Sequence, residues 1–89
     1  VSAQEVRWRT DYAAARKDAA ATGKPLLLDF AAEWCGPCKK MEATTFRNPG
    51  VVTAVTAAAI PVRVDADKDA WLVKAAGIQA FPTLILLSP

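Results

Sequence analysis

Eighty-nine residues, 53% hydrophobic and 22% charged, are enough for one globular domain with a modest core, and they leave no room for a second domain. Eleven basic and nine acidic residues give a net charge of +2, and the basic side chains are scattered along the chain, which argues against a nucleic-acid partner. The longest apolar runs, such as residues 84–87, are far too short to span a bilayer.

The first predicted element is an amphipathic helix. Thr10 can cap its start, and Gly23 followed by Pro25 ends it. Four apolar residues recur along it at helical spacing: Trp8, Tyr12, Ala15 and Ala19. We expect Trp8, like Trp71 on a later helix, to lie in the core, and Met41 to be a packing residue.

A buried strand and two helices are predicted next. Residues 26–31 form a near-continuous apolar run of strand length, which is typical of a strand buried on both faces. A helix should then run from Cys35 to about residue 46. Asn48 can cap a following helix, with Pro49 as its first residue, that continues to about residue 59.

The remaining elements are a strand, a helix and a strand. Residues 60–64 alternate like a strand, Asp65 or Asp67 can cap a helix that stops at Gly77, and residues 83–87 form the last strand. Long helical crossovers between strands imply a parallel pair in an α/β arrangement with right-handed connections.

Both cysteines of the chain lie in the segment Trp34-Cys35-Gly36-Pro37-Cys38, at the predicted strand-to-helix junction. Residues three apart share a helix face, so the two sulfurs can approach within disulfide distance. A cysteine that opens a helix faces free N–H groups and the positive end of the dipole, which lowers a thiol pKa and favours the nucleophilic thiolate. Pro37 suits a first turn, and Gly36 lets a partner chain approach closely. The pattern favours thiol–disulfide chemistry.

Other interpretations of these residues are weaker. A structural zinc site needs more Cys or His ligands than two cysteines and no histidine provide, and haem attachment needs a histidine where Lys39 stands. A calcium loop starting at Asp65 lacks the required Gly and Glu, so its acids are better read as helix caps. A purely structural disulfide would close a very short loop, worth only roughly 2 kcal/mol.

Residues 24–38, KPLLLDFAAEWCGPC, together with Phe81-Pro82-Thr83 resemble the thioredoxin superfamily over nearly the whole chain. Residues 38–51, CKKMEATTFRNPGV, are similar to the C-terminal domain of the transmembrane disulfide reductase DsbD. Ala43 stands where ordinary thioredoxins have a proline, whereas the Gly-Pro dipeptide between the cysteines is the same as in ordinary thioredoxins. The resemblance implies a thioredoxin-like α/β fold with a central mixed sheet flanked by helices. The family's last strand and helix would follow residue 87, so we expect a C-terminally truncated domain with an exposed sheet edge that offers a place for self-association.

The resemblance assigns roles to individual residues. Cys35 would be the attacking thiolate and Cys38 the resolving thiol. Asp29 matches the buried acid that relays the Cys38 proton, and its place in an apolar strand agrees, since an isolated buried carboxylate is costly; the alternative is an ordinary buried acid paired with a lysine. The basic residue that thioredoxins often carry near this acid is missing, because Pro61 occupies the matching place.

The surface around the cysteines would bind substrate. Trp34 matches the aromatic residue beside the redox pair, with a core residue as the alternative. Pro82 matches a proline preceded by a cis peptide bond, which sequence alone does not predict because such bonds are a minority. Phe81 would offer backbone groups to an extended peptide, and the alternative for this stretch is a plain turn.

The function predicted is a thiol–disulfide oxidoreductase that reduces protein disulfides, with an upstream thiol donor and no metal or organic cofactor, since the dithiol is the redox centre. The alternative is a thioredoxin-fold peptide-binding or assembly module with a non-catalytic disulfide. The likeness to an exported domain favours the bacterial periplasm or cell envelope, and a cytoplasmic relative would share the same site.

Overall fold

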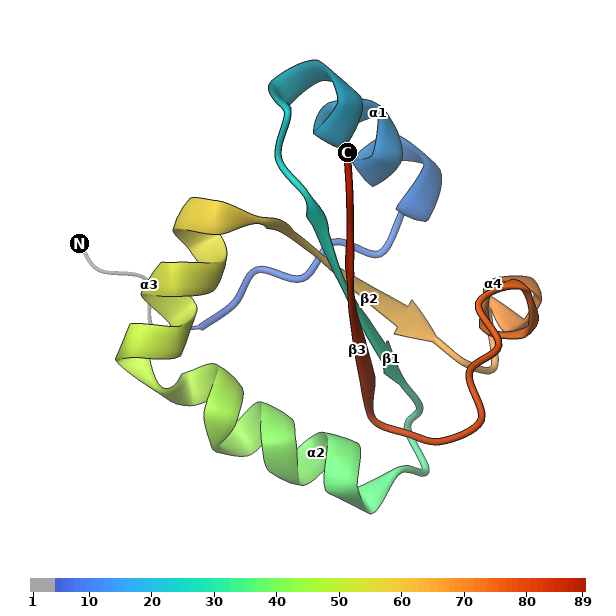
Figure 1. The fold of residues 1–89 in the computed structure, drawn as a ribbon. Coiled ribbons are helices and arrows are strands. Elements are labelled where there is room, and N and C mark those ends of the chain that lie inside the picture. The colour runs from blue at the N-terminus through green and yellow to red at the C-terminus, as the bar shows by residue number, and fades with distance from the viewer. Residues whose placement is uncertain (1–4) are drawn as a thin grey trace.

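Three strands form a mixed sheet around a central strand, β1 (Leu26–Ala31), in the computed structural model, which describes residues 5–89. β2 (Ile60–Asp65) pairs with β1 in parallel, and β3 (Thr83–Leu87) pairs with its other edge in antiparallel orientation (Figure 1). The α/β fold with a mixed sheet flanked by helices is therefore as predicted. The register places Asp29 between Arg63 of β2 and Leu84 of β3.

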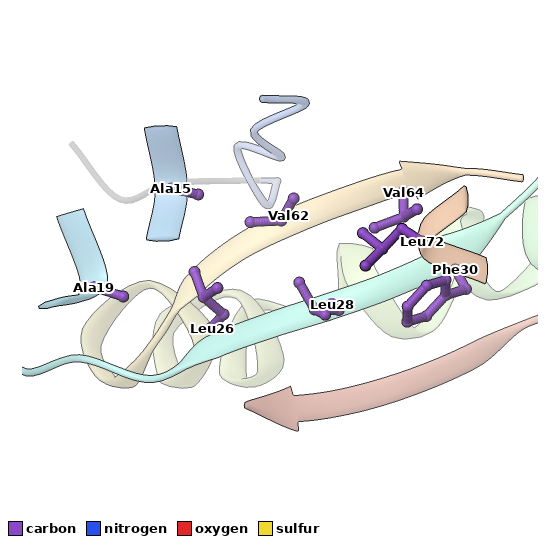
Figure 2. Packing of buried hydrophobic residues seen from close by; sticks show 8 residues of the cluster. All are labelled: Ala15, Ala19, Leu26, Leu28, Phe30, Val62, Val64 and Leu72. Atoms are coloured by element: carbon purple, nitrogen blue, oxygen red, sulfur yellow. The ribbon is translucent and has the colours of Figure 1, made fainter. Parts of the chain in front are cut away.

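Helices precede β1 and connect the strands: α1 (Tyr12–Thr22), α2 (Gly36–Ala43), the 3₁₀ turn η1 (Thr45–Arg47), α3 (Pro49–Ala58) and α4 (Ala70–Ala75). Successive strand residues point to opposite faces of a sheet. On one face, alternate residues of β1 and β2 form the main core with small residues of α1 and with Leu72 of α4 (Figure 2). Burial of this face holds α1 and α4 on the sheet.

The opposite face of the sheet is more polar and has a smaller apolar cluster. It carries Asp29 and Arg63, and Arg63 also contacts Glu42 of α2. The side chains of Val6, Phe46 and Val52 form the apolar cluster, on which Trp8 and Met41 pack as expected. Trp8 nevertheless lies ahead of α1 rather than on it. Its segment runs along β2, since the Arg9 N–H donates to the Pro61 carbonyl at 2.9 Å and the Arg63 N–H donates to the Arg9 carbonyl at 2.8 Å.

Two helix N-caps differ from prediction, and a third is as predicted. Asp11, not Thr10, caps α1: its backbone is extended and its carboxylate accepts from the Ala14 N–H at 3.0 Å. Asp69 occupies the N-cap position of α4, while the Asp65 side chain accepts from backbone N–H groups in the preceding turn. Asn48 caps α3 as predicted, accepting from two N–H groups of its first turn.

Two further expectations were wrong. The helix expected from Cys35 to about residue 46 ends at Ala43 and continues as the 3₁₀ turn. Trp71 is 61% exposed rather than buried, because the six-residue α4 presents Leu72 to the sheet and leaves its neighbour outside, edge-on to Tyr12. No helix within residues 5–89 is long and apolar enough to cross a membrane.

Candidate redox site

The redox site begins where β1 ends. Cys35 occupies the N-cap position of α2 with an extended backbone, and its sulfur accepts a hydrogen bond from the Cys38 N–H at 3.1 Å. The two cysteines form a disulfide, with Cα atoms 5.3 Å apart. The Cys35 sulfur thus lies at the N-terminus of α2, and the Cys38 sulfur comes from the first turn of the same helix.

Exposure alone does not distinguish the two cysteines. Cys35 is 4% exposed and Cys38 is 7% exposed, so both are buried. Their helical positions do distinguish them, since the cap position places the Cys35 sulfur against the N–H groups at the positive end of the helix, which favours negative charge. Gly36 and Pro37, the first two residues of α2, are exposed beside the pair, and the space next to Gly36 is open.

The segment entering β3 lies against the cysteines. The Phe81–Pro82 peptide bond is cis. Phe81 packs against the buried cluster that contains both cysteines. The Trp34 and Phe81 rings form a T-shaped contact with their centroids 5.7 Å apart. Trp34 is 66% exposed, so the alternative that it is a core residue is wrong. Its indole N–H donates to the Asp67 carboxylate at 3.1 Å, a contact that the sequence analysis missed.

Asp29 lies on β1 and is 3% exposed at its side chain, and its partner Arg63 lines the same cavity as Cys38. The Arg63 guanidinium donates to Asp29 at 3.3 Å through Nη2 and to Glu42 at 3.0 Å through Nη1. Burial raises the pKa of the Asp29 carboxyl above its ordinary value; Arg63 opposes this rise and Glu42 adds to it. The expectation that no basic residue accompanies this acid was therefore wrong, as was a lysine partner.

The alternation of residues 60–64 contained the signal for Arg63. Ile60, Val62 and Val64 face the main core, so Arg63 must point to the opposite face, and the parallel register then sets it beside Asp29. Pro61 lies on the same face two residues earlier and pairs with Leu27 rather than Asp29. Pro61 occupies the position of the basic residue in the family pattern, whereas the strand pairing places Arg63 beside Asp29.

A cavity of about 240 Å³ opens beside Cys38 and is bordered by the charged side chains of Glu42 and Arg63. It gives solvent a route to the inner cysteine and to the ion pairs below it. Within residues 5–89, no group of three or more His, Cys, Asp or Glu side chains is placed to hold a metal ion. The fold and the paired cysteines define a thiol–disulfide redox domain.

Comparison with known proteins agrees with this class. The sequence pattern of the thioredoxin-like family matches residues 7–89. Thioredoxin-1 of Drosophila melanogaster is 34% identical over 82 residues, which cover 92% of this chain and 72% of that protein. DsbD of Cronobacter sakazakii is 37% identical over 70 residues, covering 75% of this chain and 12% of that protein. A thioredoxin from Thermus thermophilus superposes with a TM-score of 0.81 at 25% identity, covering 92% of this chain and 64% of that one.

The chain therefore belongs to the thioredoxin-like family, as the resemblance implied, and its likeness to DsbD is confirmed. With its cysteine pair joined as a disulfide, it is a thiol–disulfide oxidoreductase of this family. The match to DsbD concerns a small part of that protein, so the rest of DsbD carries no information about this chain.

Proposed function

We propose that this protein reduces disulfide bonds in protein substrates by dithiol–disulfide exchange. The observation that carries the proposal is the position of Cys35, which caps α2 and is bonded to Cys38 one turn away. In the reduced protein, the helix N-terminus would stabilise the Cys35 thiolate, and the second thiol would stand ready behind it.

The reaction would proceed in two steps. The Cys35 thiolate attacks one sulfur of the substrate disulfide, forms a mixed disulfide and releases the other sulfur as a thiolate, which takes a proton. Cys38 then loses its proton and attacks Cys35, which releases the second substrate thiolate. Two electrons pass from the dithiol to the substrate, and an upstream thiol donor returns them by the reverse exchange.

Asp29 would take part in the second step. Its carboxyl has a raised pKa, which suits a group that accepts the Cys38 proton and returns it to solvent. The cavity beside Cys38 supports such an exchange with water. Substrate would bind over the exposed Trp34 and Gly36-Pro37, with the backbone at Phe81-Pro82 pairing with an extended peptide.

Cysteine variants test the division of labour. With insulin as the disulfide substrate, Cys38→Ser is expected to accumulate a mixed disulfide through Cys35, visible by mass spectrometry under non-reducing conditions, whereas Cys35→Ser should accumulate none. Equal trapping by both variants would contradict the assignment. Binding of peptides that survives loss of both thiols, without turnover in the wild-type protein, would favour the peptide-binding module instead.

The reduction potential of the pair tests the direction. A value of about −270 to −200 mV, measured in thiol–disulfide buffers, would support a reductase. A value near about −120 mV would indicate an oxidant, and one well below about −300 mV would indicate a structural disulfide.

A further inference from the structure

The segment ahead of α1 behaves as a short extra strand at the outer edge of β2. Its backbone is bonded to Pro61 and Arg63, and Arg9 forms a parallel bridge with Val62. Neighbouring residues of such a segment point to opposite faces. Arg9 accordingly pairs with Asp18 of α1, while Trp8 lies on the face that carries Arg63.

The Trp8 ring packs on a buried cluster and offers a face to Arg63. It forms a T-shaped contact with the buried Phe46 ring, with centroids 4.9 Å apart and planes at 86°, within the cluster that includes Val6 and Val52. The Arg63 guanidinium carbon lies 4.9 Å from the centroid of the Trp8 ring, within the range of a cation–π contact. The ring therefore restricts where the guanidinium can lie.

The same guanidinium holds both carboxylates of the site. It donates to Asp29 and to Glu42, and its Nε is buried without a hydrogen-bond partner among residues 5–89. The other charged side chains nearby are Glu33, Lys39 and Asp65, which line the cavity with Cys38, and β3 faces Asp29 with the apolar Leu84. Among residues 5–89, the cation in direct contact with Asp29 is Arg63.

We propose that Trp8 is a positioning residue, which holds the Arg63 guanidinium against Asp29 and Glu42 and so lets the N-terminal segment set the electrostatic environment in which Cys38 gives up its proton. The catalytic role of Trp8 rests on the proposed function. Its effect on Arg63 and on the titration of Asp29 can be measured without turnover.

The test is a titration of the Asp29 carboxyl by ¹³C NMR in the full chain, oxidised and reduced. Arg63→Met should move the midpoint to higher pH, because a neighbouring cation is lost. Trp8→Leu should move it in the same direction by less, and Trp8→Phe, which keeps a ring face, should stay near the wild type. Trp8→Met provides the same comparison if Trp8→Leu does not fold.

A double variant separates positioning from general loosening. In the Arg63→Met background, Trp8→Leu should cause no further shift, since there is no guanidinium left to hold. Val52→Ala, which removes buried atoms from the same cluster, should lower stability without moving the midpoint. An unmoved midpoint in Trp8→Leu, or an equal shift without Arg63, would overturn the inference.

Insulin reduction measured across the same pH range connects the titration to the reaction. The inference predicts that the midpoint of the pH profile for Trp8→Leu moves upward together with the carboxyl titration. A carboxyl shift without a change in the pH profile would overturn the catalytic part of the inference. No turnover by the wild type would refute the proposed function, and the NMR comparison would still decide what Trp8 does to Asp29.

Discussion

Replacing Arg63 with methionine should lower the free energy of unfolding by about 2–3 kcal/mol at pH 8. A net contribution of about 1.5 kcal/mol is reasonable for the bond to Asp29, at the low end for charged groups because 3.3 Å is long. Glu42 is half exposed, so its ion pair adds at most about 0.5 kcal/mol. The contact with the Trp8 ring adds roughly 0.5–1 kcal/mol.

The loss should depend on pH. Because burial raises the pKa of Asp29 in the folded state, folding binds a proton, and stability falls as pH rises from the unfolded value of about 3.9 through the folded one. Arg63 limits that fall, so its removal matters most at high pH. Below the unfolded pKa, Asp29 is protonated in both states, and the variant should lose only about 1 kcal/mol.

Urea unfolding of the oxidised protein, followed by circular dichroism at pH 3 and pH 8, measures this difference while the cysteines do not titrate. Arg16→Met is the matched control. It removes an exposed arginine that lies 6.0 Å from the Tyr12 ring and should change stability by less than about 0.5 kcal/mol at either pH. Equal losses for Arg63→Met at both pH values would refute the reasoning, because the carboxylate would then have no part in them.

Further substitutions test local structure and the substrate surface. Asn48→Ala removes the cap of α3 and should cost about 1 kcal/mol in urea unfolding; no change would mean that its two hydrogen bonds are not needed. Gly23→Ala should lower the free energy of unfolding by about 1–2 kcal/mol, because φ is 73° at this residue; a steric clash is not the cause, since no atom lies near the added Cβ. Gly36 has no positive φ, so Gly36→Ala should lower stability clearly less, and equal losses would exclude the backbone conformation as the cause. Trp34→Ala should raise the KM for insulin with a stability change within about 0.5 kcal/mol, and Trp71→Ala, similarly exposed, should leave KM unchanged; a matching rise would show that the effect is not specific to the redox surface.

The strands were predictable because their patterns do not depend on tertiary context. The bounds of β1 and β3 match the apolar runs at residues 26–31 and 83–87, since each run is bordered by turn residues. The cap of α1 was not decided by sequence, because Thr10 and Asp11 are adjacent and both can accept a backbone hydrogen bond.

The spacing of the two cysteines was enough to predict their disulfide chemistry, whereas the residues around them depend on which strands pair. Asp29 and Arg63 are thirty-four residues apart, and only the parallel register brings them together. Trp34 and Asp67 meet in the same way across the end of the sheet. Trp71 was misplaced because the face that a short helix buries depends on where it begins, which helical spacing alone does not determine.

The central position of β1 has a consequence for local opening. Both edges of this strand are paired, and Leu26, Leu28 and Phe30 are at most 3% exposed, so their amide protons should exchange with solvent only in the rarest openings of the domain. α2 begins at Gly36, a short loop after β1 ends at Ala31, whereas α4 has six residues and an exposed tryptophan. We therefore expect the cysteines to lie next to the slowest-exchanging strand, and the region around α4 to open and close without moving the sulfurs.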